Sequence, residues 1–113
     1  MQLFSRNPRT DPQRAAQLLA AREAVVVDVR QVAEWKAGRI RGAIHIPLPQ
    51  LHAQLGRLPR DTTIITVCRS GHRSAVAARI LRRAGFQVEN LHGGLSSWAR
   101  AGLALEPRGG RVL

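Results

Sequence analysis

Two β-branched, apolar segments, residues 25–29 and 62–67, constrain the fold of this chain more than any other feature. Apolar segments of that length are typical of strands that are buried on both faces. The other predicted elements are helices over 10–21, 31–37, 49–58, 74–84 and 95–101, and strands over 43–46 and 86–91. Because strands alternate with helices, the sequence predicts an α/β fold: a small parallel sheet with helices on both faces.

The chain has 113 residues, a length that suits one domain with one core. We expect a single domain over residues 1–113, with a core over about 10–105 and a short mobile C-terminal tail over 106–113. With 44% apolar and 22% charged residues, the composition is that of a soluble globular protein. No apolar stretch approaches the about 20 residues that span a bilayer. The N-terminal residues 1–8 lack the apolar region of a secretory signal, so we expect a cytoplasmic protein with no membrane partner.

The formal net charge is +11, and nearly all of the positive charge is arginine, with Lys36 as the sole lysine. The arginines are spread along the chain, whereas nucleic-acid-binding proteins concentrate their charge on one face. Aromatic residues, at 4% of the chain, form no interleaved stripe. We therefore expect no nucleic-acid partner and interpret the charge as a field that attracts small anions.

The only cysteine opens the loop Cys68-Arg69-Ser70-Gly71-His72-Arg73-Ser74, between the 62–67 strand and the 74–84 helix. A single cysteine excludes an internal disulfide and a structural zinc site built on several cysteines. No histidines have the spacing of metal ligands, so we expect neither a metal nor a cofactor. The alternative reading of Cys68, as a small buried apolar residue, fits poorly with such a polar loop.

The position of the loop favours a reactive thiolate. Ligands of parallel sheets sit beyond the carboxyl ends of the strands, where Cys68 falls. The unpaired amides at a helix start stabilise an anion, and Arg69 and Arg73 add positive charge, so the pKa of the thiol should fall below its free value. Gly71 lets the loop turn so that successive N–H groups point inward as an anion nest.

The loop resembles the active-site loop of the rhodanese sulfurtransferases, and the resemblance extends over about residues 18–103. Further matches to the family's blocks are Asp28-Val29-Arg30, Glu34-Trp35, Gly38, Ile40, Gly42-Ala43, His45-Ile46-Pro47, Gly93-Gly94 and Trp98. Arg39 stands where the family commonly has histidine, and Val67 where an aromatic residue is frequent. The resemblance implies a three-layer rhodanese-like domain whose cysteine carries a sulfane sulfur as a persulfide.

The resemblance also implies a two-step mechanism. The Cys68 thiolate takes the outer sulfur of an anionic donor such as thiosulfate, and cyanide or a thiol then accepts it. The amides from Arg69 to Ser74 would hold the persulfide, and Arg69 and Arg73 would bind the sulfonate end. Because the chain has no second cysteine, the acceptor must be another molecule.

Two roles are open for several other residues of the predicted site. Asp28 and Arg30 are either catalytic or, as we favour, hold the loop in place through hydrogen bonds. His72 is either an acid or base, or contributes only its backbone N–H. Ser74 caps the helix or donates a hydrogen bond to the sulfur. The tryptophans Trp35 and Trp98 are interpreted as core anchors, and His45 as a residue that packs after its strand.

Two rival functions remain. The first is a phosphatase or arsenate reductase: cell-cycle phosphatases share this fold, but their loops place five residues between cysteine and arginine. Only four residues separate Cys68 from Arg73, which suits a single sulfur atom better than a phosphate. The second rival is a persulfide carrier or docking module that delivers sulfur to a protein partner, with the same chemistry at Cys68.

Overall fold

The computed structural model describes residues 8–113. The expectation that residues 1–8 carry no secretory signal falls largely on residues outside this range. Five parallel strands form one sheet in the order β1-β5-β4-β2-β3. The strands are β1 (Arg9–Thr10), β2 (Ala24–Asp28), β3 (Ile44–His45), β4 (Thr63–Val67) and β5 (Val88–Leu91). The predicted parallel sheet is therefore confirmed, with β4, the strand that leads to the cysteine, at its centre.

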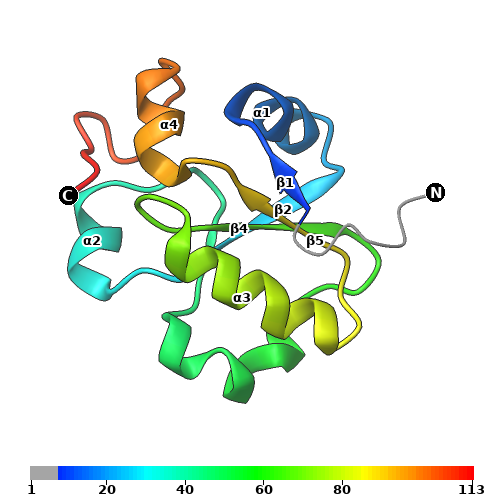
Figure 1. The fold of residues 1–113 in the computed structure, drawn as a ribbon. Coiled ribbons are helices and arrows are strands. Elements are labelled where there is room, and N and C mark those ends of the chain that lie inside the picture. Colours follow the sequence, from blue (N-terminus) through cyan, green and yellow to red (C-terminus); the bar gives the residue numbers. More distant parts are fainter. Residues whose placement is uncertain (1–7) are drawn as a thin grey trace.

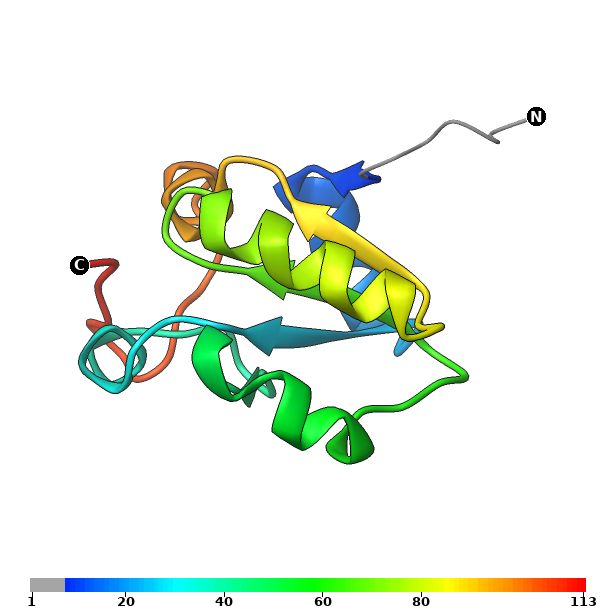
Figure 2. The same ribbon diagram turned by 60° about the horizontal axis from the view of Figure 1, so that its bottom comes forward.

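Helices cover both faces of the sheet, as Figures 1 and 2 show. On one face lie α1 (Pro12–Ala20) and α4 (Gly94–Arg100), and on the other lie α3 (His72–Arg83) and the 3-10 helices η1 (Leu48–Gln50) and η2 (His52–Arg57). The short α2 (Val32–Ala37) lies at the side, near the C-terminus of the chain (Figure 1). Each face has its own cluster of buried apolar side chains, which makes the predicted three layers.

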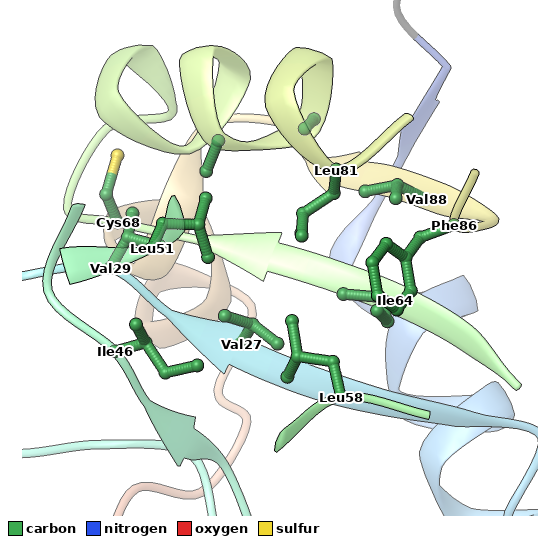
Figure 3. Close-up of a cluster of buried hydrophobic side chains, with 12 residues drawn as sticks. Val27, Val29, Ile46, Leu51, Leu58, Ile64, Cys68, Leu81, Phe86 and Val88 are labelled. Atoms are coloured by element: carbon green, nitrogen blue, oxygen red, sulfur yellow. The ribbon is translucent and has the colours of Figure 1, made fainter. Parts of the chain in front are cut away.

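The two-residue period of β4 decides which way the cysteine points. Ile64 packs into the cluster on the α3 face, Ile65 and Val67 pack into the opposite cluster, and Cys68 returns to the α3 face. Cys68 lies at one end of the α3-side cluster, with its sulfur directed toward the first turn of α3 (Figure 3). The thiol therefore lies just beyond the carboxyl end of the central strand β4, under the first turn of α3.

Local signals set the helix ends. Asp11 caps α1 by accepting a hydrogen bond from the Arg14 N–H at 2.8 Å, with Pro12 as the first helical residue. Gly85 follows the end of α3 with a φ of +94°, in the left-handed region expected of a terminating glycine. The helix predicted over 10–21 therefore spans Pro12–Ala20, and the helix predicted to end at residue 84 ends at Arg83.

Several predicted elements differ in detail. The segment predicted as one helix over 49–58 is two 3-10 helices, and Gln54 has non-helical φ/ψ values of −122° and 18° within the second. Helix α3 begins at His72 rather than Ser74. The spacing of Val76, Ala77, Ile80, Leu81 and Ala84 predicts one apolar face of that helix. Ala77 and Leu81 are buried in the core and Ile80 and Ala84 pack against it, whereas Val76 is 38% exposed.

Two peripheral segments extend the domain. The edge strand β1 was not predicted; it pairs with β5 through Thr10 and Leu91. The C-terminal residues form backbone hydrogen bonds: Arg111 N–H donates to Ala37 O at 2.7 Å, and Glu106 exchanges hydrogen bonds with Arg39. The residues of the expected mobile tail thus have defined contacts, and their mobility itself stays a prediction. Within residues 8–113, no helix has the length and apolar character needed to cross a bilayer.

Candidate active site

The loop after β4 forms a ring around the cysteine sulfur. Gly71, with a φ of +108°, precedes the first turn of α3 and turns the chain back over Cys68. The sulfur Sγ accepts hydrogen bonds from the Gly71 N–H at 3.1 Å, the Ser74 N–H at 3.4 Å and the Ser74 hydroxyl at 3.3 Å. Of the two readings of Ser74, the structure therefore shows the hydrogen bond to sulfur.

These hydrogen-bond donors stabilise the Cys68 thiolate and so oppose the effect of burial on its pKa. Burial of the Cys68 thiol raises its pKa, whereas the Ser74 hydroxyl and the backbone N–H groups of Ser74 and Gly71 lower it. The N–H of Ser70 adds to the lowering, and the net result is a pKa below the ordinary value for cysteine. The side chain is only 1% exposed, so the thiolate is both stabilised and shielded from solvent.

Helix α4 explains why the loop amides point inward. Its Leu95 N–H donates to Cys68 O at 2.8 Å, and its Ser96 N–H donates to Arg69 O at 3.0 Å. Because these two hydrogen bonds hold the carbonyl groups of Cys68 and Arg69 toward α4, the N–H groups of the loop face the sulfur. The approach is close: a Cβ on Gly94 would lie 2.5 Å from Arg69 O and 2.6 Å from Cys68 O. Only glycine fits there, which gives a physical role to the Gly93-Gly94 pair.

On one side of the ring, which we call the α2 flank, arginines are paired with carboxylates. Arg30 and Asp28 are fully buried and form a bidentate ion pair with distances of 2.9 Å (Nε to Oδ1) and 2.7 Å (Nη2 to Oδ2). Arg30 Nη2 also donates to Gly38 O at 2.7 Å, so the pair ties β2 to the end of α2. Asp28 receives its hydrogen bonds from Arg30 rather than from the cysteine loop, so its predicted role in holding the loop stays a prediction.

The second pair of the α2 flank involves a loop residue. Arg73 donates to both carboxylate oxygens of Glu34, at 2.7 and 2.9 Å. The Arg73 side-chain hydrogen bond lowers the pKa of Glu34 from 4.5 to about 2. Glu34 also accepts the Gln31 N–H at 3.1 Å, which fixes it at the start of α2. Arg73, predicted to bind the donor, is thus held by a carboxylate that sequence reasoning did not assign to the site.

Trp35 differs from its predicted role as a core anchor. It is half-buried, stacks on His45 with ring centroids 4.6 Å apart, and carries the Arg39 guanidinium over its ring at 5.0 Å. His45 in turn donates from Nε2 to Arg30 O at 2.7 Å, which supports the buried ion pair. Trp98, by contrast, is 5% exposed and belongs to the core, as predicted.

The opposite side of the ring, the β5 flank, uses neutral groups. Thr66 and Asn90 are direct neighbours in β4 and β5, both buried, and the Thr66 hydroxyl donates to Asn90 Oδ1 at 3.2 Å. Asn90 Nδ2 donates to Gly71 O at 3.1 Å, which anchors the turn of the loop. Sequence reasoning missed both residues, although polar side chains in otherwise apolar strands were the signal that could have found them.

The remaining loop side chains lie outside the ring of donors. The Arg69 side chain is exposed and has no hydrogen-bond or ion-pair partner among residues 8–113. The exposed His72 places Nδ1 3.3 Å from Ser70 Oγ and makes no contact with the cysteine sulfur. Its side chain therefore has no part in the hydrogen bonding of the thiol. Across residues 8–113, His, Cys, Asp and Glu side chains nowhere gather in threes as they would around a metal ion.

The family model of the rhodanese-like domain matches residues 11–101. The chain belongs to the rhodanese-like family. It is 37% identical over 97 residues to a sulfurtransferase of Allochromatium vinosum, which covers 84% of this chain and 91% of that protein. It is also 41% identical over 96 residues to the HTH-type transcriptional regulator Rv0324 of Mycobacterium tuberculosis, where the match covers 80% of this chain but only 42% of the regulator.

Solved structures agree with the family. The rhodanese-related protein of Thermoplasma volcanium superposes with a TM-score of 0.82 at 28% identity, over 87% of this chain and 96% of that one. The rhodanese-like fold was therefore correctly predicted from the residues of the loop and its companion motifs. In this rhodanese-like domain, the ring of hydrogen-bond donors around Cys68 is the feature that bears most directly on function.

Proposed function

We propose that this domain is a sulfurtransferase that moves a sulfane sulfur from an anionic donor, such as thiosulfate, through a persulfide on Cys68 to cyanide or a thiol. The observation that carries the proposal is the ring in which the only cysteine accepts three hydrogen bonds at its sulfur. Such preorganised donors stabilise the thiolate before the reaction and the persulfide anion after it.

In the loading step, the Cys68 thiolate attacks the outer sulfur of thiosulfate. The new S–S bond forms as the bond to the sulfonate sulfur breaks, and sulfite leaves with the electron pair. Arg69 is the free cation of the loop and binds the sulfonate group as it arrives. The Arg73 guanidinium, which is hydrogen-bonded to Glu34, adds to the electrostatic field that attracts the sulfonate group. Ser70, Gly71, His72 and Ser74 contribute backbone N–H groups to the anion.

In the discharge step, the acceptor attacks the outer sulfur and Cys68 leaves as the thiolate that began the cycle. Cyanide yields thiocyanate, and a thiol yields a new persulfide. Because Cys68 is the only cysteine, the acceptor comes from outside the chain. A protein acceptor is the second candidate: the matched regulator is longer than this chain, so such domains occur joined to other parts.

A phosphatase is the less favoured function because of the size of the ring. Four residues lie between Cys68 and Arg73, and the arginine that would hold a phosphate is occupied by Glu34. The amides that remain converge on one sulfur atom. This geometry supports transfer of sulfur rather than hydrolysis of a phosphate ester.

A turnover assay tests the proposal. With thiosulfate and cyanide as substrates, we expect wild-type protein to produce thiocyanate catalytically, and Cys68→Ser to produce none. The exposed Arg83→Gln, at the far end of α3, is the control and should stay active. Hydrolysis of an aryl phosphate at a comparable rate, or thiocyanate formation by Cys68→Ser, would overturn the assignment.

A further inference from the structure

A hollow of about 260 Å³ lies beside the cysteine ring on the β5 flank. Arg9 and His92, from the ends of β1 and β5, contribute basic side chains to its lining. Ser70 and His72 of the loop line it as well, together with Asn90. The hollow therefore borders the loop that surrounds the reactive sulfur without containing Cys68 itself.

The charges of this hollow are unlike those of the α2 flank. Arg9 Nη1 donates to His92 Nδ1 at 3.3 Å, so two basic groups lie side by side. His72 adds a third basic side chain, which contacts only the Ser70 hydroxyl. No Asp or Glu is among the described residues that line the hollow. Basic groups that neighbour one another without a carboxylate favour the binding of an anion.

The hollow also has the right place for a second substrate. Its lining shares Gly71 with the donors to the sulfur and includes Ser70 and His72 of the same loop, so a ligand bound there lies against the loop that holds Cys68. On the opposite flank Arg73 is already occupied by the Glu34 carboxylate. The β5 flank therefore carries the basic groups that remain available to an anionic acceptor.

We propose that the hollow binds the carboxylate of a small thiol acceptor, and so directs its thiol to the persulfide on Cys68. This inference rests on the proposed sulfurtransferase function and names the acceptor class. In the step RSH + Cys68–S–S⁻ → RS–SH + Cys68–S⁻, the acceptor sulfur bonds to the outer sulfur and its proton passes to that sulfur. The bond to Cys68 Sγ breaks, and its electron pair stays on Sγ, where the loop donors receive it.

The test compares two acceptors that differ only in charge, 3-mercaptopropionate and 3-mercaptopropionamide. The protein is loaded with thiosulfate or, should thiosulfate not load it, with polysulfide, and discharge of the persulfide is timed by intact mass. The readout is the ratio of the two rate constants, in which shared effects on reactivity cancel. For Arg9→Gln we expect this ratio to fall about threefold, the size of one solvent-exposed charge contact.

Arg83→Gln is the matched control, because it removes the same charge from an exposed site at the far end of α3. Its ratio should equal that of the wild type. An unchanged ratio in Arg9→Gln, or an equal fall in Arg83→Gln, would overturn the inference. So would a slower loading by thiosulfate in Arg9→Gln with an unchanged acceptor ratio, since the hollow would then serve the donor.

A binding measurement separates this inference from the proposed function. Unloaded protein is titrated with 3-(methylthio)propionate and with its amide, and the backbone amide resonances are followed by NMR. We expect the carboxylate to shift Arg9, His92 and Gly93, and the amide to leave them in place. Shifts without any persulfide chemistry would uphold the anion site and reject the sulfurtransferase. Active sulfur transfer with no such shifts would reject the anion site alone.

Discussion

The two flanks of the cysteine ring differ in whether their basic side chains are paired with carboxylates. On the α2 flank, Arg30 pairs with Asp28 in the interior and Arg73 pairs with Glu34 at the surface. On the β5 flank, neutral groups of Thr66 and Asn90 hold the loop, and the basic side chains outside them have no carboxylate partner in the hollow. Paired charges fix the position of chain segments, whereas unpaired ones are available to ligands. The difference suggests that the α2 flank mainly supports the ring and the β5 flank receives substrate.

Breaking the buried pair of the α2 flank should have the largest effect. In Asp28→Asn the Arg30 guanidinium stays buried without its counter-charge, and we expect a loss of about 3–5 kcal/mol in the free energy of unfolding. Urea denaturation measures it. The exposed Asp61→Asn is the control and should change stability by less than about 0.5 kcal/mol. A loss below about 1 kcal/mol for Asp28→Asn would show that the pair does not support the fold.

Removing the amide of the β5 flank should cost less, because no charge is left behind. Asn90→Ala removes the partner of Thr66 and one donor to Gly71 O, while the Ala75 N–H still donates to that carbonyl at 3.0 Å. We expect a loss of about 1–3 kcal/mol in unfolding free energy. Gln87→Ala, exposed in the segment before β5, should be nearly neutral in the same urea titration. An Asn90→Ala protein as stable as Gln87→Ala would contradict the anchoring role.

The surface pair of the α2 flank should have the smallest effect on stability. At neutral pH we expect Glu34→Gln to lose about 1 kcal/mol or less, because the Arg73 side chain is 38% exposed and water screens the pair. The pKa of Glu34 is lowered from 4.5 to about 2 in the folded protein, so the pair contributes fully above pH 4.5. As pH falls from 4.5 toward 2, the carboxylate is protonated and the contribution disappears.

Urea midpoints of wild type and Glu34→Gln at several pH values measure this difference. The two proteins should differ at pH 6 and converge near pH 2. A difference that grows as the pH falls would show that the carboxylate stabilises the fold in its protonated form, against the geometry of the pair.

The fold was predictable because its signals are local. The β-branched runs of β2 and β4, the cap of α1 and Gly85 after α3 each act within a few residues of the chain. The loop was predictable for the same reason, since strand, cysteine and helix start follow one another directly. Residues 49–58 are the exception: the spacing of the leucines indicated one helix, whereas the segment folds as two 3-10 helices with a kink at Gln54.

The partners of the site were not predictable, because they come from distant parts of the sequence. Glu34 and Arg73 are 39 positions apart, and the Thr66–Asn90 contact depends on the register of two strands. Trp35 carried the signal of a core residue, but its neighbours in space are His45 and Arg39, which turn it into a stacking surface near the buried ion pair. Such contacts require the assembled fold.

Loading of Cys68 tests the central claim most directly. Wild-type protein is incubated with thiosulfate, and its intact mass is measured before and after addition of cyanide. The account predicts a gain of one sulfur atom, absent in Cys68→Ser, and its complete removal by cyanide with release of one thiocyanate per protein. No gain in the wild type, or the same gain in Cys68→Ser, would contradict the claim that the ring exists to hold sulfur on this cysteine.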